Sequence, residues 1–140
     1  MIGCSACLLG VACRYDGASK PDNKIIEFSK KEELFRFCPE QLGGLPTPRP
    51  RSEIRGDIVI NEHGEDITAF LEKGSEKVLE LLLQRNIKKV ILKQNSPSCG
   101  CGNVYDGTFT GKLIPGNGIT TELLKRNGIK VVSEKELFQE

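Results

Sequence analysis

The order of apolar and polar residues along the chain predicts strands that alternate with helices. Residues 67–85 carry apolar side chains at steps of three, four and seven, which predicts the longest helix, capped by Asp66. Short apolar runs without this period are typical of strands buried in a sheet. These runs lie at residues 1–9, 57–60, 89–93 and 129–132.

Local signals predict two further helices and two turns. Residues 118–127 have the pattern of a helix, and Ser133 with Glu136 forms a capping box that predicts a terminal helix. The tripeptide Tyr-Asp-Gly occurs twice, at residues 15–17 and 105–107. Because Asp-Gly pairs are typical of turns, we expect a turn at each place.

The segment before Cys38 carries a capping-box pattern of its own. Ser29 and Glu32 have the S-x-x-E spacing, which predicts a short helix that leads to Phe37. Pro39 cannot continue a helix, so we expect Cys38 at a boundary, at the end of a strand.

These elements predict an α/β fold in a single domain that spans residues 1–140. The fold class is a mostly parallel sheet with helices on both faces, a Rossmann-like arrangement. Ligands of such folds bind beyond the carboxyl ends of the strands, and Cys7, Cys38 and Cys99 each follow a predicted strand end. Residues 41–55, rich in Gly, Pro and Arg, predict a long functional loop.

Composition narrows the expected partners and the compartment. The formal net charge is +1 and the chain has no Trp, so we expect no nucleic-acid partner. No apolar stretch approaches the ~20 residues that span a bilayer, and the first basic residue, Arg14, follows the apolar N-terminal run. We therefore expect a cytoplasmic protein without a membrane segment. In that reducing compartment the six cysteines are expected as thiols, metal ligands or redox groups.

The cysteine spacing alone leaves several kinds of chemistry open. Cys4 and Cys7 form C-x-x-C, which suits a redox pair or half of a zinc site, whereas Cys99 and Cys101 form only C-x-C. The lone His63 lies in a polar turn and is expected as a solvated residue. Thiolates select zinc, copper(I) or iron–sulfur clusters, but the spacing does not separate such a site from buried structural thiols.

Three motifs in order carry a resemblance to a known family. The chain resembles a small bacterial family that was long described as a domain of unknown function and that includes the thiouracil desulfidases. The motifs are SACLLG with CRYDG at residues 5–17, CPE with GGLPTPR at residues 38–49, and SPSCG at residues 96–100. The later stretches YDGTF, GKLIPG and RNGI, between residues 105 and 129, are similar to the family as well.

The resemblance implies a 4Fe-4S cluster held by Cys7, Cys38 and Cys99. The fourth iron then has no protein ligand, and an open coordination position is the mark of a catalytic metal site. The implied reaction removes sulfur from a small thiolated pyrimidine such as 2-thiouracil: water replaces the sulfur, sulfide is released, and no net electron transfer is needed. Cys4 or Cys101 remains a candidate for a fourth ligand.

The same resemblance implies the residues that act on the substrate. Glu40 is the candidate for activating water or moving the proton, and Ser96 for positioning water or substrate. Without the resemblance, Glu40 is equally understood as a helix N-terminal carboxylate and Ser96 as a turn residue. The candidate substrate-binding residues are Gly44, Arg49, Asn95 and Ser98.

Two other functions stay open at this point. One is a non-catalytic protein that binds a metal or an iron–sulfur cluster. The other is a thiol-redox protein that uses Cys4 and Cys7. The sequence does not define the oligomeric state.

Overall fold

Four parallel strands form the central sheet of the protein. The structure is a computed structural model and describes residues 1–137. The sheet order is β2-β1-β5-β8, and every neighbouring pair is parallel. The strands are β1 (Ile2–Ser5), β2 (Leu34–Phe37), β5 (Lys89–Leu92) and β8 (Lys130–Ser133).

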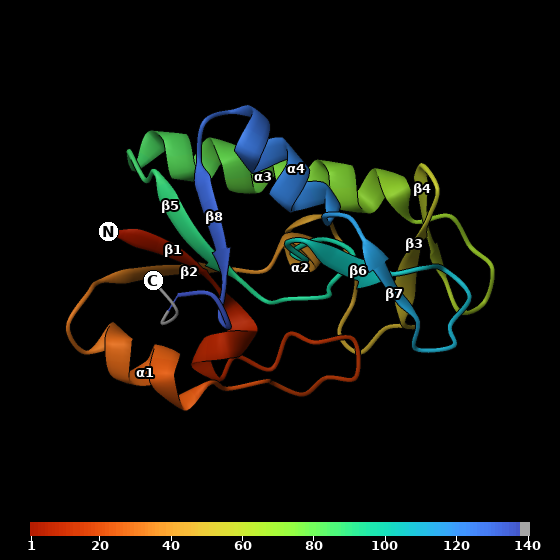
Figure 1. Cartoon of the computed structure of the whole chain (residues 1–140), viewed down its shortest axis with the longest axis horizontal. Coiled ribbons are helices and arrows are strands. Elements are labelled where there is room, and N and C mark those ends of the chain that lie inside the picture. Colours follow the sequence, from red (N-terminus) through yellow and green to blue (C-terminus); the bar gives the residue numbers. More distant parts are fainter. Residues whose placement is uncertain (138–140) are drawn as a thin grey trace.

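Helices cover both faces of this sheet, as the sequence pattern predicts. Figure 1 shows α3 (Thr68–Gln84) and α4 (Ile119–Arg126) on one face and α1 (Asn23–Ser29) on the other. The strand side chains alternate accordingly, because successive residues of a strand point to opposite faces. In β5, Val90 packs in the cluster with the residues of α3 and α4, whereas Ile91 packs in the cluster with Ile25 of α1. The α/β prediction is confirmed.

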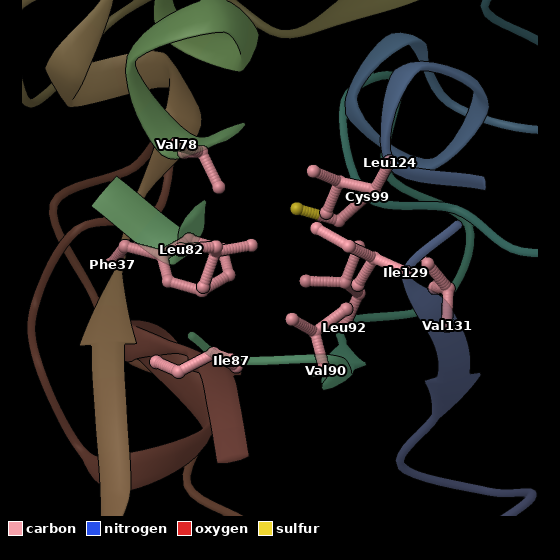
Figure 2. Close-up of a cluster of buried hydrophobic side chains, with 10 residues drawn as sticks. All are labelled: Phe37, Val78, Leu82, Ile87, Val90, Leu92, Cys99, Leu124, Ile129 and Val131. Carbon is pink, nitrogen blue, oxygen red and sulfur yellow. The ribbon is translucent and has the colours of Figure 1, made fainter. Parts of the chain in front are cut away.

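The larger apolar cluster joins α3 and α4 to the sheet. Cys99 belongs to this cluster although it lies in an irregular loop, and its side chain is 4% exposed. Figure 2 shows its sulfur among apolar carbon side chains. The cluster consists of Phe37, Val78, Leu82, Ile87, Val90, Leu92, Cys99, Leu124, Ile129 and Val131.

Cys38 follows the end of a strand, as predicted, but the segment before it is not the predicted helix. Residues 34–37 form strand β2 instead of a helix, and the helix α1 lies earlier in the chain. Asp22 caps α1 by accepting hydrogen bonds from the backbone N–H groups of Lys24 at 2.9 Å and Ile25 at 3.2 Å. Ser29 therefore ends a helix instead of beginning one. The local capping-box pattern is overridden because β2 pairs with β1 along its whole length.

The predicted long loop at residues 41–55 is partly regular. It begins within the short helix α2 (Pro39–Leu42) and ends with β3 (Ser52–Arg55). β3 pairs antiparallel with β4 (Ile58–Asn61), and a second antiparallel pair joins β6 (Asn103–Tyr105) to β7 (Leu113–Pro115). Both pairs lie beyond the central sheet, on the side that carries α2 (Figure 1).

Three shorter features remain: a 3-10 helix after β1, the start of α3, and the turn after Ser133. A 3-10 helix, η1 (Ala6–Leu9), directly follows β1. The N-cap of α3 is Ile67 and not Asp66 as predicted, although the Asp66 side chain accepts a hydrogen bond from the backbone N–H of Thr68 at 2.9 Å. Beyond Ser133 the described residues form a turn, and the rest of the predicted terminal helix, residues 138–140, lies outside them. None of the helices within residues 1–137 has the length and apolar character of a transmembrane segment.

Two glycines allow α2 to lie directly against α3. A Cβ atom on Gly74 would stand 1.8 Å from the carbonyl oxygen of Pro39, and one on Gly43 would stand 2.0 Å from that of Phe70. Any side chain at either place would push the two helices apart. This contact fixes the position of α2, and thereby of Glu40 in its first turn.

Candidate functional site

A cavity of about 350 Å³ opens at the carboxyl ends of β1, β2 and β5. Its walls come from segments far apart in the sequence: η1, α2, the start of β3, and the loop from residue 93 to residue 99. This is the edge of a parallel sheet where α/β folds bind their ligands. The cavity is therefore the candidate functional site.

One cysteine follows each of three neighbouring strands, and all three cysteines line this cavity. Cys7 lies in η1 after β1, Cys38 follows β2 directly, and Cys99 lies in the loop after β5. Because the strand order is β2-β1-β5, the three chain segments leave the sheet side by side. The structure thus brings together the three cysteines that the sequence singles out.

Cys13 is a fourth cysteine on the cavity wall. Its thiol contacts the thiols of Cys38 and Cys7, and its backbone carbonyl lies 3.9 Å from the sulfur of Cys38. The hydrogen bond with Cys38 lowers the pKa of Cys13. The contact with Cys7 and burial outweigh this effect and raise the pKa to about 11.

The thiols of Cys38 and Cys99 also favour the protonated form. Contact with Cys13, followed by burial, raises the pKa of Cys38 well above its ordinary value. Burial raises the pKa of Cys99 to about 12, although hydrogen bonds with Ser98 and Ser5 act in the opposite direction. A metal that binds these thiolates therefore displaces protons from the site.

Cys4 and Cys101 lie apart from the cavity lining. Cys4 is completely buried in β1, and burial is the largest cause that raises its pKa to about 12. A redox cysteine needs an accessible thiol of low pKa, so Cys4 lacks both properties of the thiol-redox function. Cys101 is half-buried, and its sulfur lies 4.0 Å from the carbonyl oxygen of Val131. The candidate fourth thiol at the cavity is therefore Cys13.

The donor set fits an iron–sulfur cluster. The side chains of four cysteines are soft sulfur donors that line one cavity from several directions. They are Cys7, Cys13, Cys38 and Cys99. Among residues 1–137, no group of three or more His, Cys, Asp or Glu side chains has the arrangement that would hold a single metal ion. His63 lies in the Asn61–Gly64 turn, where its backbone N–H donates to the Asn61 side chain.

Glu40 and Arg49 form a nearly buried ion pair on the cavity wall. Their side chains are 13% and 6% exposed. The Nε and Nη2 atoms of Arg49 both donate to Oε2 of Glu40, with Nε at 2.9 Å. Nη2 also donates to the carbonyl oxygen of Cys13 at 2.9 Å, and Nη1 donates to Pro46 and Thr47. The guanidinium is thus occupied by protein acceptors and holds Glu40 in one orientation.

The other carboxylate oxygen of Glu40, Oε1, is hydrogen-bonded to one serine, which in turn contacts a second. Oε1 of Glu40 accepts a hydrogen bond from the hydroxyl of Ser98 at 3.4 Å. The Ser98 hydroxyl lies 3.0 Å from that of Ser96 and 3.6 Å from the sulfur of Cys99. Ser96 also accepts hydrogen bonds from the backbone N–H groups of Ser98 and Cys99. A continuous polar path therefore joins Glu40, Ser98 and Ser96 beside Cys99.

Of the two remaining candidate substrate-binding residues, Asn95 lies at the cavity and Gly44 does not. Asn95 lines the cavity, and its φ of 65° is a conformation that Asn tolerates better than most residues. Gly44 is exposed in the loop after α2 and is not part of the cavity wall. A substrate contact of Gly44 therefore has no support from the shape of the site.

Three further residues of the cavity wall carry no functional prediction from the sequence. These are the two tyrosines, Tyr15 and Tyr105, and the buried Glu53. The repeated Tyr-Asp-Gly tripeptide was the available signal. Both copies form turns, as predicted, in which the Asp side chain accepts a backbone N–H two residues later. Each turn also places its tyrosine at the cavity.

Comparisons with known proteins agree with this geometry. A family model described as 2-thiouracil desulfurase matches residues 2–136. The uncharacterized protein YbbK of Bacillus subtilis (strain 168) is 43% identical over 147 residues, which cover 98% of this chain and 97% of that protein. Among solved structures, the chain is similar to the 4Fe-4S-dependent thiouracil desulfidase TudS (DUF523Vcz). The TM-score is 0.92 with 46% identity, over 99% of this chain and 93% of the other.

Proposed function

Because this chain belongs to the 2-thiouracil desulfurase family, we propose that it is a 4Fe-4S-dependent desulfidase that hydrolyses a small thiolated pyrimidine. The overall reaction exchanges sulfur for oxygen. Water supplies the oxygen that becomes the carbonyl of the product, and the sulfur leaves as hydrogen sulfide. For 2-thiouracil the product is uracil, and no electrons are gained or lost.

One observation carries this proposal. The cavity that receives Cys7, Cys38 and Cys99 also contains the buried pair of Glu40 and Arg49. Metal-binding sulfur and a fixed carboxylate therefore share one enclosed space. A protein that only stores or carries a cluster has no need of the buried carboxylate of Glu40.

Cys7, Cys38 and Cys99 are the proposed ligands of the cluster. Bound there, the cluster would supply a Lewis-acidic iron with an open coordination position, which would make the thiocarbonyl carbon of the substrate more electrophilic. The proposal leaves Cys13 as a thiol beside two of the ligands.

Glu40 is the proposed acid and base of the reaction. A carboxylate oxygen can accept a proton from the attacking water and pass it to the departing sulfur. Arg49 binds Oε2, so Oε1 is the oxygen available for this work. Ser98 donates to Oε1 and lies next to Ser96, so these hydroxyls can hold the water and extend the path of the proton.

The geometry favours a positioning role for Arg49 over direct substrate binding. Each nitrogen of its guanidinium donates to a protein oxygen. A substrate would have to displace one of these partners from a nearly buried group. Ser98 and Asn95 remain the proposed polar contacts of the substrate.

The direct test uses protein purified and loaded with iron and sulfide under anaerobic conditions. We expect a broad visible absorbance, iron and sulfide in comparable amounts, and release of sulfide with formation of uracil from 2-thiouracil. A loaded protein that binds 2-thiouracil without converting it would support the cluster-carrier alternative. A colourless protein with stoichiometric zinc would overturn both the cofactor and the activity.

The location and partners belong to the same proposal. We place the enzyme in the cytoplasm, because all six cysteines are free thiols in the structure and an oxygen-sensitive cluster needs a reducing compartment. The expected partner is a small thiolated molecule, with no role for nucleic acid.

A further inference from the structure

Glu53 is a buried carboxylate on the cavity wall that the proposed chemistry does not use. It lies in β3 and is 7% exposed. Its Oε1 atom accepts hydrogen bonds from the backbone N–H groups of Gly107 at 3.0 Å and Phe109 at 3.2 Å. These two amides come from the loop between β6 and β7, so two separate antiparallel pairs meet at this side chain.

Within residues 1–137, this buried carboxylate forms no ion pair with a cation. Within the described part of the chain, no lysine or arginine nitrogen lies within ion-pair distance of Glu53. The nearby Arg55 donates to the carbonyl oxygen of Gly107, and Arg51 pairs with the exposed Glu62. A buried carboxylate without a cation is costly for folding, and such groups are characteristic of functional sites.

The second oxygen of Glu53 is available to a ligand. Both backbone N–H groups donate to Oε1, and none of the described residues donates to Oε2. Among residues 1–137, no fully buried side-chain oxygen lacks a hydrogen-bond partner, so Oε2 retains contact with open space. Glu53 is also one of the residues that line the cavity. A small molecule in the cavity therefore meets a hydrogen-bond acceptor of fixed orientation.

The loop that fixes Glu53 depends on Gly107. This residue has a φ of +91°, and a Cβ atom there would stand 2.8 Å from both Cβ of Arg55 and the carbonyl oxygen of Ile54. Glycine alone permits this approach, which brings the N–H of residue 107 onto Glu53. The second Tyr-Asp-Gly tripeptide thus docks on β3 and orients the carboxylate.

We propose that Glu53 recognises the substrate by accepting a hydrogen bond from a ring N–H group next to the thiocarbonyl. This inference rests on the proposed function. A 2-thiouracil ring has an N–H on each side of the carbon that carries sulfur, and a carboxylate oxygen is a strong acceptor for such a donor. Glu40 and Glu53 then have separate roles: Glu40 acts on the water and Glu53 orients the substrate ring. The preferred substrate class is therefore a cyclic thioamide with a free N–H.

The test compares Glu53→Gln with the wild type, both loaded with cluster. The amide oxygen of Gln can still accept from the N–H groups of Gly107 and Phe109, so its NH₂ group must face the cavity and oppose a ring N–H. Glu76→Gln, an exposed position on α3, is the matched control. The substrates are 2-thiouracil and its two forms methylated on one ring nitrogen.

We expect the wild type to lose about 10–100-fold in kcat/KM with one of the two methylated substrates, since a buried acceptor is then left unpaired. Glu53→Gln should lower kcat/KM for 2-thiouracil by a similar factor and remove the discrimination between the two methylated forms. Calorimetry should show the same loss in its affinity for uracil. Iron content and melting temperature should match those of Glu76→Gln.

The possible failures are distinguishable. If Glu53→Gln converts 2-thiouracil and its methylated forms like the wild type, Glu53 has no role in recognition and the inference is wrong. If the loaded wild type binds 2-thiouracil through Glu53 but releases no sulfide, the proposed function fails while the recognition stands. If Glu53→Gln does not fold, equal conversion of all three substrates by the wild type still overturns the inference.

Discussion

Arg49 binds Glu40 and the backbone carbonyl of Cys13 with the same guanidinium nitrogen. The contact joins the loop after α2 to the segment after η1, which are 36 residues apart at this point in the chain. Both partners lie beside the proposed cluster ligands. Arg49 therefore connects the position of the proposed acid–base residue to the position of the cysteine loop, and this relationship leads to the first prediction.

Replacing Arg49 with Lys should lower kcat and leave KM nearly unchanged. The lysine ammonium keeps the charge but cannot reproduce the planar fork that donates to Glu40, Cys13 and Thr47 together. We expect kcat to fall about 10–100-fold, the effect of losing one or two charge-assisted hydrogen bonds. Steady-state kinetics on cluster-loaded protein measures both constants, and Arg126→Lys, an exposed change on α4, is the control. A rise in KM with constant kcat would instead show that Arg49 binds the substrate.

Replacing Glu40 with Gln should nearly abolish sulfide release. Gln retains the shape of the side chain but cannot take a proton from water, and general acid–base groups contribute about 10²–10⁴ in rate. Ser98→Ala should cost about tenfold, since it removes one hydrogen bond to Oε1 of Glu40. Iron content and absorbance should stay at wild-type levels in both variants. Unchanged turnover in Glu40→Gln, compared with the exposed control Glu72→Gln, would remove Glu40 from the mechanism.

Replacing Gly74 with Ala should destabilise the protein although it lies in a helix. In a free helix this change stabilises by about 0.5–1 kcal/mol. Here the added Cβ would meet the carbonyl oxygen of Pro39 at 1.8 Å, so α2 must move away from α3. We expect a loss of at least about 2 kcal/mol in the free energy of unfolding, measured by denaturant titration, together with reduced activity. Lys73→Ala, at the neighbouring exposed position, should show neither effect.

The contact of Asp66 with the first residue of α3 should make the stability of the protein depend on acidic pH. The side-chain and backbone hydrogen bonds from Thr68 hold the pKa of Asp66 below its ordinary value. A carboxyl group whose pKa is lowered by folding stabilises the native state above its unfolded pKa. This stabilisation is lost as the pH falls through the folded pKa. Asp66→Asn should therefore lower the melting temperature at neutral pH and flatten its decrease below about pH 4.

A control separates the effect of the Asp66–Thr68 contact from general effects of acid. Asp57 is exposed in the turn between β3 and β4 and is the position for a matched Asp→Asn change. Its variant should follow the wild type across the acidic range. Parallel melting curves for Asp66→Asn and the wild type below pH 4 would show that the contact of Asp66 with Thr68 does not stabilise the fold.

The parts of the fold that could be predicted are those in which the pattern of apolar residues follows directly from which side chains are buried. The helical period of residues 67–85 and the apolar run of residues 89–93 correspond to α3 and β5. Ahead of Cys38, the strand end was expected but the predicted helix was wrong, because residues 34–37 become a strand through their pairing with β1. The nearby Ser29 and Glu32 supply a local signal for a helix start, and tertiary pairing overrides it.

The same distinction holds for the site. Cys7, Cys38 and Cys99 were predictable as neighbours because parallel strands bring their carboxyl ends to one edge. The partners of Arg49 and Glu53 were not, since each depends on a distant loop. Glu53, for example, accepts its backbone hydrogen bond from Gly107, 54 residues away. No periodicity or spacing in the sequence encodes such a contact.

The cysteines around the cavity allow a test of which thiols hold the cluster. Cys38→Ser should lose the visible absorbance and most of the iron, because a serine hydroxyl is a poor ligand for iron in a cluster. Cys13→Ser is the matched variant, since its thiol contacts that of Cys38 and lies on the same wall. We expect it to retain the iron and sulfide of the wild type, because the proposed ligand set does not include it. Loss of iron in Cys13→Ser with full loading in Cys38→Ser would exchange the roles of the two residues. Loss in both would show a fourth ligand and a site without the open iron position on which the proposed reaction depends.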